Sequence, residues 1–275
     1  MTSTIASPTA APPRGRTEHL APPARPLTVF ATFVGRSMLH TLRTPDALIM
    51  AIALPTILML MFTFVFGGAI DPSGNYVDYV VPGIILLCAG FGAASAAVDV
   101  ANDMTAGVID RFRTMPLRAS TVITGHVVAS LVRNLAATGI VVGVAVLLGF
   151  RPTGSLLDWV GMVALVAGYI LAITYLFAAI GLAASTPEAA SGYGFFLMFL
   201  PYLSSAFVPV DSMPEWLQPI AEHQPLTPII ETIRGLLLGT EIGNSGWLAV
   251  GWCALILAVA IVLTRVLFRK KAGRR

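Results

Sequence analysis

A run of apolar residues without any charge, Trp159 to Ala184, constrains this chain more than any other feature. It exceeds the roughly 20 residues that a helix needs to cross a bilayer. The chain is 56% hydrophobic and 11% charged, whereas soluble domains carry about 25% charged residues. The composition therefore excludes a soluble globule and predicts an integral membrane protein.

Six apolar segments predict an all-α membrane protein with six transmembrane helices. They are Ala47–Phe66, Val80–Val100, Val127–Leu148, Trp159–Ala184, Ala189–Val208 and Trp247–Phe268. Pro55 and Pro201 fall inside the first and fifth segments, and membrane helices tolerate proline. We take residues 27–270 as one transmembrane domain that contacts membrane lipids, followed by a basic tail, 271–275.

The N-terminal residues differ from the rest. Residues 1–26 hold six prolines and no apolar run, which predicts a disordered tail and no signal peptide. From Leu27 to Leu42 apolar residues recur at helical spacing, which favours an amphipathic helix in the membrane interface. An ordinary cytoplasmic extension of the first span is the alternative.

The basic residues predict the orientation. Five precede the first span, three lie between the second and third, and six lie at or beyond the end of the sixth, together 14 of 17. Because lysine and arginine collect on the cytoplasmic side, both termini are expected to be cytoplasmic. Basic residues in short blocks beside spans give no indication of a nucleic-acid partner.

The segment 214–239 is half apolar and is interrupted by Pro219, Pro225 and Pro228. The part after Pro228 is too short to cross a bilayer. We therefore expect a re-entrant pair of short helices, which needs cover from protein or a wet cavity. An extracellular loop with one surface helix is the alternative.

The chain carries no recognisable catalytic or metal-binding motif. A phosphate-binding loop needs a lysine beside its glycines, and the two lysines present are Lys270 and Lys271, at the C-terminal end. The four histidines are scattered and lack metalloprotease spacing, so no metal site is expected. Cys88 and Cys253 lie in apolar runs, which is typical of packed, reduced thiols. Energy for transport is therefore expected from a partner.

A short polar segment, Asp99 to Ser120, interrupts the apolar pattern between the second and third spans. Met104, Val108, Phe112 and Met115 share one helical face, and Pro116 ends the pattern. Force on such a cytoplasmic helix would move both neighbouring spans. A helix resting on lipid headgroups is the alternative.

The run Asp103-Met-Thr-Ala-Gly-Val-Ile-Asp-Arg-Phe-Arg-Thr-Met-Pro116 resembles the D-x-x-x-G-x-x-D-R-F-x-x-x-P signature of type-2 ABC exporter permeases, and more narrowly their daunorubicin-resistance branch. Gln224-Pro225-Leu226-Thr227, followed by Glu231 and Arg234, resembles a second family element before the last span. Gln224 departs from the asparagine that many members carry. The resemblance covers about residues 27–270.

The resemblance implies a half-transporter in the bacterial cytoplasmic (inner) membrane. Its partners would be two copies of an ABC ATPase, which bind ATP and Mg, and a second permease chain, identical or sister. Residues 102–116 would form the coupling helix that docks on the ATPase. The coupling residues are Met104, Gly107, Val108, Asp110, Arg111, Phe112, Arg113, Met115 and Pro116. The second motif contributes Pro225, Thr227, Glu231 and Arg234.

Polar residues within apolar spans are the candidate substrate pathway: Arg133, Asn134, Thr174, Ser204 and Ser205. Such side chains serve helix packing as often, and Arg133 is also placed to snorkel or to pair with Asp99 or Asp103.

The expected function is export of amphiphilic drugs, natural products or lipids, with no ATPase site on this chain. A lipid-linked glycan exporter of the same architecture is the nearest alternative. An intramembrane enzyme using His126, His223, Glu222 or Asp99 belongs to a different class, as does a non-transporting assembly or sensor subunit.

Overall fold

The computed structural model describes residues 45–72, 74–105 and 119–272. The predicted disordered tail, the interfacial helix before the first span, coupling residues Gly107 to Pro116 and residues 273–275 lie outside these ranges. Of the predicted coupling helix, residues 102–105 are described, and they form the last turn of a long helix rather than the start of a new one.

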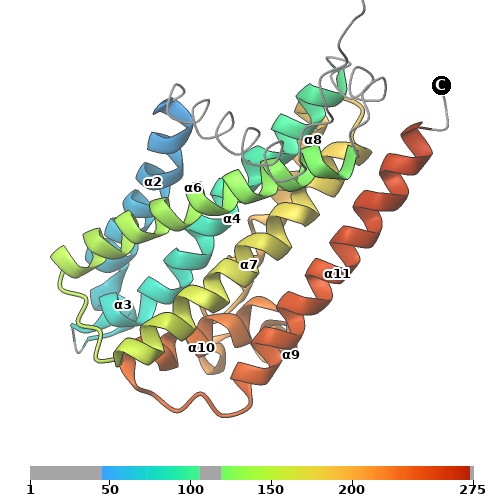
Figure 1. Ribbon diagram of the computed structural model, residues 1–275. Helices are drawn as coiled ribbons and strands as arrows, with labels where there is room; N and C mark the ends of the chain where they lie inside the picture. Colours follow the sequence, from blue (N-terminus) through green and yellow to red (C-terminus); the bar gives the residue numbers. More distant parts are fainter. Residues whose placement is uncertain (1–44, 73, 106–118, 273–275) are drawn as a thin grey trace, which may run out of the picture.

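Every regular element in the described ranges is helical, as expected for an all-α membrane protein (Figure 1). The elements in chain order are α2 (Pro45–Leu60), η1 (Met61–Phe66), α3 (Gly67–Ile70), α4 (Tyr76–Thr105), α6 (Ala119–Leu147), α7 (Leu156–Ala183), α8 (Pro187–Leu197), η2 (Leu200–Leu203), η3 (Val210–Ser212), α9 (Gln218–His223), α10 (Leu226–Leu238) and α11 (Ser245–Ala272).

Five helical stretches within these ranges are long and apolar enough to cross a bilayer. They are Ala51–Ile70, Tyr76–Asn102, Ser130–Leu147, Leu156–Ala183 and Ser245–Leu267. Each overlaps one of the six predicted spans, namely the first, second, third, fourth and sixth. The first is not a uniform α-helix, because η1 is a π-helical turn.

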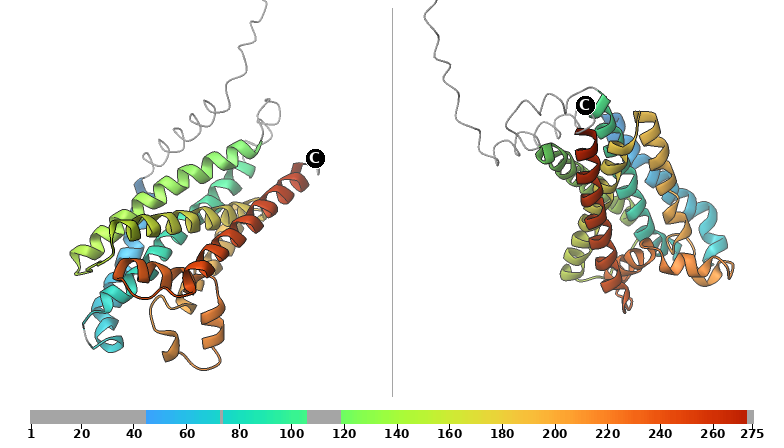
Figure 2. Two further views of the ribbon diagram at one scale, coloured as in Figure 1. Left: turned by 60° about the horizontal axis from the view of Figure 1, so that its bottom comes forward. Right: turned by 90° about the vertical axis from the view of Figure 1, so that its right-hand side faces the viewer.

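The fifth predicted span, Ala189–Val208, is not a single helix in the structure. Helix α8 ends at Leu197, the 3₁₀ turn η2 covers Leu200–Leu203, and Ser204 has an extended backbone with ψ of −177°. Pro201 has no N–H to donate, and its ring disfavours helical geometry in the residue before it. The chain from α8 to η3 nevertheless runs from one end of the helix bundle toward the other (Figure 2).

Capping residues determine where α7 begins and where α10 ends. Ser155 precedes α7, and its hydroxyl accepts from the Asp158 backbone N–H while the Asp158 carboxylate accepts from the Ser155 N–H. This reciprocal capping box satisfies two donors that a helix start leaves free. Helix α10 ends at Gly239, whose φ of 71° suits glycine at a helix C-terminus.

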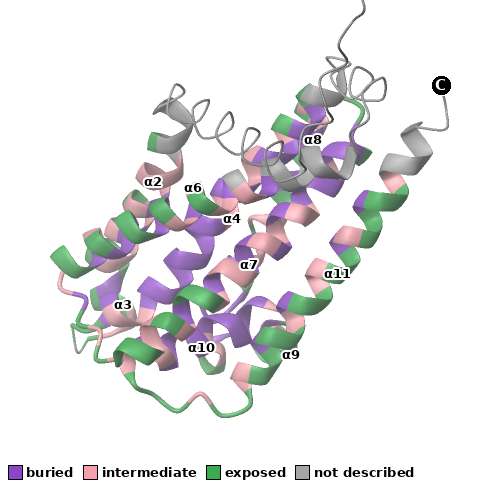
Figure 3. Cartoon of the chain, in the orientation of Figure 1, coloured by how far each residue is buried: buried purple, intermediate pink, exposed green. Residues whose placement is uncertain are grey.

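Helix α4 is the centre of the bundle. It contacts α2, α6, α7, α8 and α10. In its most apolar stretch of 18 residues, 67% of the residues are buried, whereas the corresponding share in α11 is 17%. Figure 3 shows this difference: buried residues predominate on α4 in the middle of the bundle, whereas exposed and intermediate residues predominate on α11 at the right. In a membrane protein the exposed apolar side chains of α11 are available to lipid or to another subunit.

The ends of the helices define two ends of the molecule. Helix α2 begins, α4 ends, α6 begins and α11 ends at one end, whereas α3 and α10 lie at the other (Figures 1 and 2). The two helices that flank the predicted coupling residues therefore approach the end of the molecule that is remote from α10.

Candidate functional site: a helix break held by α4 and α10

The break after η2 consists of Ser204–Phe207, which we call the break segment. Its four residues are 0%, 2%, 0% and 4% exposed. Backbone N–H and C=O groups in a buried, non-helical segment need partners from outside the segment. At membrane depth such a segment persists only where protein covers it.

Helix α4 supplies one set of partners. The Tyr76 hydroxyl donates to the Phe207 carbonyl at 2.6 Å, and the Tyr79 hydroxyl donates to the Ser205 carbonyl at 2.9 Å. A Cβ on Gly83 would lie 2.6 Å from the Cβ and 2.8 Å from the carbonyl oxygen of Ala206. Tyr76, Tyr79 and Gly83 occupy one face of α4 because they are three and four residues apart.

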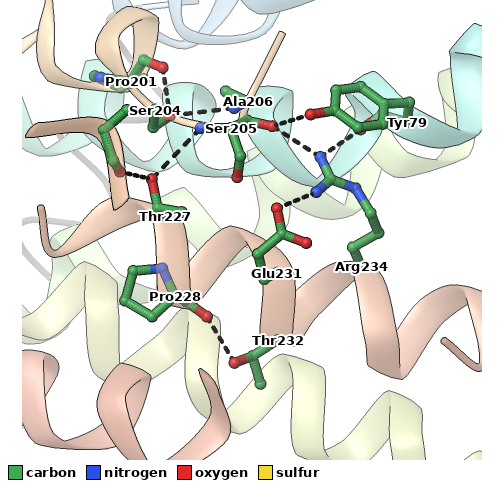
Figure 4. Close-up of polar contacts among 11 residues, drawn as sticks. Tyr79, Pro201, Ser204, Ser205, Ala206, Thr227, Pro228, Glu231, Thr232 and Arg234 are labelled. Atoms are coloured by element: carbon green, nitrogen blue, oxygen red, sulfur yellow. Dashed lines mark hydrogen bonds and ion pairs between the residues drawn. The ribbon is translucent and has the colours of Figure 1, made fainter. Parts of the chain in front are cut away.

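Helix α10 supplies the second set (Figure 4). The Thr227 hydroxyl accepts from the Ser205 N–H at 3.4 Å and donates to the Ala221 carbonyl, which ties α9 to α10. Arg234 Nη2 donates to the Ser205 carbonyl at 2.9 Å and to the Tyr79 carbonyl at 3.0 Å. Both helices therefore converge on the backbone of Ser205.

The charge of Arg234 is balanced locally. Arg234 is 8% exposed, and its Nη1 lies 2.6 Å from Glu231 Oε1 in an ion pair. Its guanidinium carbon also lies 3.9 Å from the centre of the Tyr79 ring, a cation–π contact. A planar guanidinium can make these contacts simultaneously, because its donors lie in a fixed fork. We call Tyr79, Ser205, Glu231 and Arg234 the Arg234 clamp.

Within 214–239, where a re-entrant pair of short helices is predicted, the structure has two short helices, α9 and α10. Most of α10 is buried, and it packs against α4, α7 and α11. Pro225 is its N-cap and Pro228 lies in its first turn, where backbone N–H groups have no partner within the helix. Protein thus covers α10 as a re-entrant helix requires, and its depth in the membrane stays a prediction.

The serines of the predicted pathway support the break segment. The Ser204 hydroxyl donates to the Pro201 carbonyl and accepts from the Ala206 N–H at 3.2 Å. The Ser205 hydroxyl is buried and has no hydrogen-bond partner among the described residues. Their assignment to a substrate pathway stays a prediction, and in this conformation neither hydroxyl faces open space.

The other pathway candidates on α6 form a separate polar cluster against α4. Arg133 Nη2 donates to the Ser95 hydroxyl at 2.6 Å and to the Gly92 carbonyl at 3.3 Å. Asn134 is fully buried and donates to Ser130 at 3.4 Å. Thr174 lies fully buried on α7, apart from this cluster in the sequence.

Gly92 gives Asn134 its space, because a Cβ there would lie 1.4 Å from Asn134 Oδ1. We therefore expect Gly92→Ala to destabilise the protein and Asn134→Ala to relieve that loss when the two changes are combined. The coupling between contacting residues is expected at about 1–3 kcal/mol. Thermal unfolding of the four purified variants in detergent measures it. Additive losses would show that the two side chains do not compete for one space.

Sequence reasoning missed Tyr76, Tyr79 and Gly83 as parts of this site. Both tyrosines precede the second predicted span, Val80–Val100, and the available signal was their helical spacing from Gly83 near its start. Within the described ranges, no three His, Cys, Asp or Glu side chains are close enough to hold a metal ion. Cys88 and Cys253 are free and buried.

The fold and the site define a multi-pass helical membrane protein in which two helices hold a break in a third segment. Residues 28–238 match the family model for the ABC-2 type transporter, a range that includes both sequence motifs. The chain belongs to the ABC-2 type transporter family and is a membrane permease of an ABC transporter.

Three relatives are similar over most of the chain. It is 32% identical over 253 residues to the daunorubicin resistance ABC transporter permease protein DrrB1 of Streptomyces coeruleorubidus, covering 90% of this chain and 89% of the relative. It is 26% identical over 252 residues to the probable doxorubicin resistance ABC transporter permease protein DrrC of Mycobacterium tuberculosis, covering 86% and 90%. It is 28% identical over 225 residues to the putative transport permease ycf38 of Cyanophora paradoxa, covering 78% and 74%.

Proposed function

We propose that this chain is the membrane subunit of an exporter that moves amphiphilic drugs, natural products or lipids outward across the bacterial cytoplasmic membrane. The observation that carries the proposal is its similarity, over most of its length, to permeases named for resistance to daunorubicin and doxorubicin. Resistance to a compound that acts inside the cell is obtained by moving that compound outward.

The energy comes from a separate ATPase subunit. Membership of an ABC transporter family implies such a partner, and the chain has no lysine before Lys270 with which to build a phosphate-binding loop. We propose two ATPase copies and a second permease chain, identical or sister, in the working unit, with both termini of this chain in the cytoplasm.

The interior supports an amphiphilic cargo rather than a charged polymer. In α7 the one charged residue is Asp158, in the first turn, and in α8 it is Glu188, also in the first turn. A path along these helices would present apolar and aromatic side chains. Burying such surface is the main source of affinity for an apolar ligand.

Transport by the reconstituted protein tests the proposal. The permease and its partner ATPase are placed in vesicles, and daunorubicin is used as the probe. We expect ATP-dependent movement of the probe and faster ATP hydrolysis in its presence, because cargo and ATP bind to one coupled machine. The ATPase in vesicles without the permease is the control. No ATP-dependent movement of daunorubicin or of a fluorescent lipid would overturn the proposal.

A further inference from the structure

We propose that Arg234 is a positioning residue of the transport cycle: the Arg234 clamp holds the break segment closed on α4 and opens when α4 moves. The part of this inference that concerns transport rests on the proposed export function. The part that concerns holding of the break segment rests on the structure alone.

The first step is the convergence of two donors, from two different helices, on one carbonyl. The Ser205 carbonyl accepts from the Tyr79 hydroxyl on α4 and from Arg234 Nη2 on α10. Arg234 Nη2 also bonds the Tyr79 carbonyl at 3.0 Å. A small shift of α4 relative to α10 therefore changes the contacts of Ser205 directly, without an intermediate element.

The second step is that α4 connects this end of the molecule to the other. It is one helix of 30 residues from Tyr76 to Thr105, about 45 Å long at 1.5 Å per residue. Its first turn carries Tyr76 and Tyr79, and its last turn leads into the predicted coupling residues. Motion that an ATPase imposes near Thr105 is transmitted along a packed, rigid helix to the Arg234 clamp.

The third step concerns α8, on the other side of the break, which packs against α4 and α7 and presents its other side outward. Only Ala190 and Gly194 of α8 are buried, and Tyr193, Phe195 and Phe196 are 59%, 60% and 74% exposed. The break segment next to it is almost completely buried. Helix α8 and the break segment both pack against α4, so motion of α4 reaches both of them, and the Arg234 clamp holds the break segment until α4 moves.

The location of the Arg234 clamp indicates on which side of the membrane the exit would open. It lies at the end of the molecule that carries α10, away from the ends of α4 and α6 that flank the coupling residues (Figure 1). In the proposed orientation this is the outer end. A closed break segment there separates the interior from the outside, and its release opens an exit for cargo.

The test of holding measures the accessibility of the break segment. Ser205→Cys is a suitable probe, because the Ser205 hydroxyl has no hydrogen-bond partner among the described residues and its backbone makes the contacts. A membrane-impermeant maleimide is added to the full chain in sealed vesicles. The same chain without Ser205→Cys gives the background from Cys88 and Cys253, which are both buried.

In this background Arg234→Lys is expected to raise the alkylation rate about ten-fold, since the loss of a hydrogen bond from a charged group changes an equilibrium by about that factor. An ammonium keeps the charge, but its one nitrogen cannot take the places of both Nη1, which bonds Glu231, and Nη2, which bonds the two carbonyls. Tyr79→Phe keeps the ring under Arg234 and is expected to give a smaller rise. Thr232→Val is the matched control. Thr232 lies on α10 and is about as buried as Arg234, but its hydroxyl donates to the Pro228 carbonyl within the same helix and not to the break segment.

The role in transport is measured as daunorubicin molecules moved per ATP hydrolysed, which does not depend on how much protein assembles. We expect Arg234→Lys to lower this ratio about ten-fold and Thr232→Val to leave it unchanged. Equal alkylation rates in Arg234→Lys, Tyr79→Phe and the parent would overturn the holding role. A raised alkylation rate with an unchanged ratio would overturn the transport role. If the parent moves no cargo, the proposed function fails, and the alkylation rates still decide whether Arg234 holds the break segment.

Discussion

Replacing Gly83 with valine is expected to abolish accumulation of the folded permease in the membrane. Even the Cβ of a new side chain would lie 2.6 Å from the Ala206 Cβ and 2.8 Å from its carbonyl oxygen. Ala206 belongs to the break segment, whose backbone is fixed from both sides by α4 and α10. Adding methyl groups to a packed core typically destabilises a protein by about 1–3 kcal/mol, even where neighbouring side chains can move aside. Here the neighbour is backbone that is fixed on both sides, so we expect a larger loss.

Gly90→Val is the matched control, because Gly90 lies two turns further along the same helix and a Cβ there meets nothing within 4 Å. The measurement is the amount of monodisperse protein extracted by mild detergent, with the thermal midpoint of the extracted fraction. We expect Gly90→Val near the parent value. Parent-like amounts of Gly83→Val with a parent-like midpoint would show that the break segment is not seated against α4 in the membrane.

Reversing the charge of Arg111 is expected to separate the permease from its ATPase while leaving the permease folded. Arg111 stands beside Phe112 in the motif Asp103–Pro116 that we propose as the docking helix. A reversed charge in a docked interface costs several kcal/mol, because like charges are brought together and a partner group loses its counter-charge. We expect at least a ten-fold loss of co-purified ATPase and loss of cargo-stimulated ATP hydrolysis.

Arg118→Glu provides the comparison for Arg111→Glu, since it makes the same charge change two residues after Pro116, outside the motif. Phe112→Ala removes the proposed apolar anchor and is expected to weaken binding without any change in charge. Co-purification of the ATPase with Arg111→Glu and Phe112→Ala at the level of the parent would exclude this segment as the docking site. A loss of binding in Arg118→Glu equal to that in Arg111→Glu would indicate a general charge effect instead.

The positions of five spans could be predicted from the sequence because apolarity and length decide them. The predicted fourth span, Trp159–Ala184, and the observed helix, Leu156–Ala183, differ by a few residues at the start, where the Ser155 capping box decides the boundary. The end of α10 at Gly239 was also predictable, since glycine tolerates the positive φ that ends a helix.

The interruption of the fifth span could not be predicted in the same way. Ala189–Val208 is as apolar as its neighbours, and a single proline is compatible with a continuous membrane helix. What maintains the break are partners far away in the sequence. Tyr76 and Tyr79 are separated from the break segment by 131 and 126 residues, and no local pattern reports such pairings.

The Arg234 clamp was predictable only in part, because Tyr79 was not among the predicted site residues. Thr227, Glu231 and Arg234 stood out as a motif with a family resemblance, and their spacing places them on one helical face. That the face meets Ser205, and that Tyr79 completes the contacts, depends on how α4 and α10 pack. The resemblance predicted a role for Glu231 and Arg234, and the structure shows which groups these two side chains contact.

The buried break segment also has a consequence for the order in which the chain is made. When Ser205 leaves the ribosome, Tyr79 has already emerged, but Thr227 and Arg234 are still inside the exit tunnel. Backbone groups without partners are costly in lipid, so the segment that follows α8 cannot take its final position until about residue 234 has emerged. A nascent chain stopped before that point is expected to remain in contact with the insertion machinery, whereas one that extends beyond α10 is released into the bilayer.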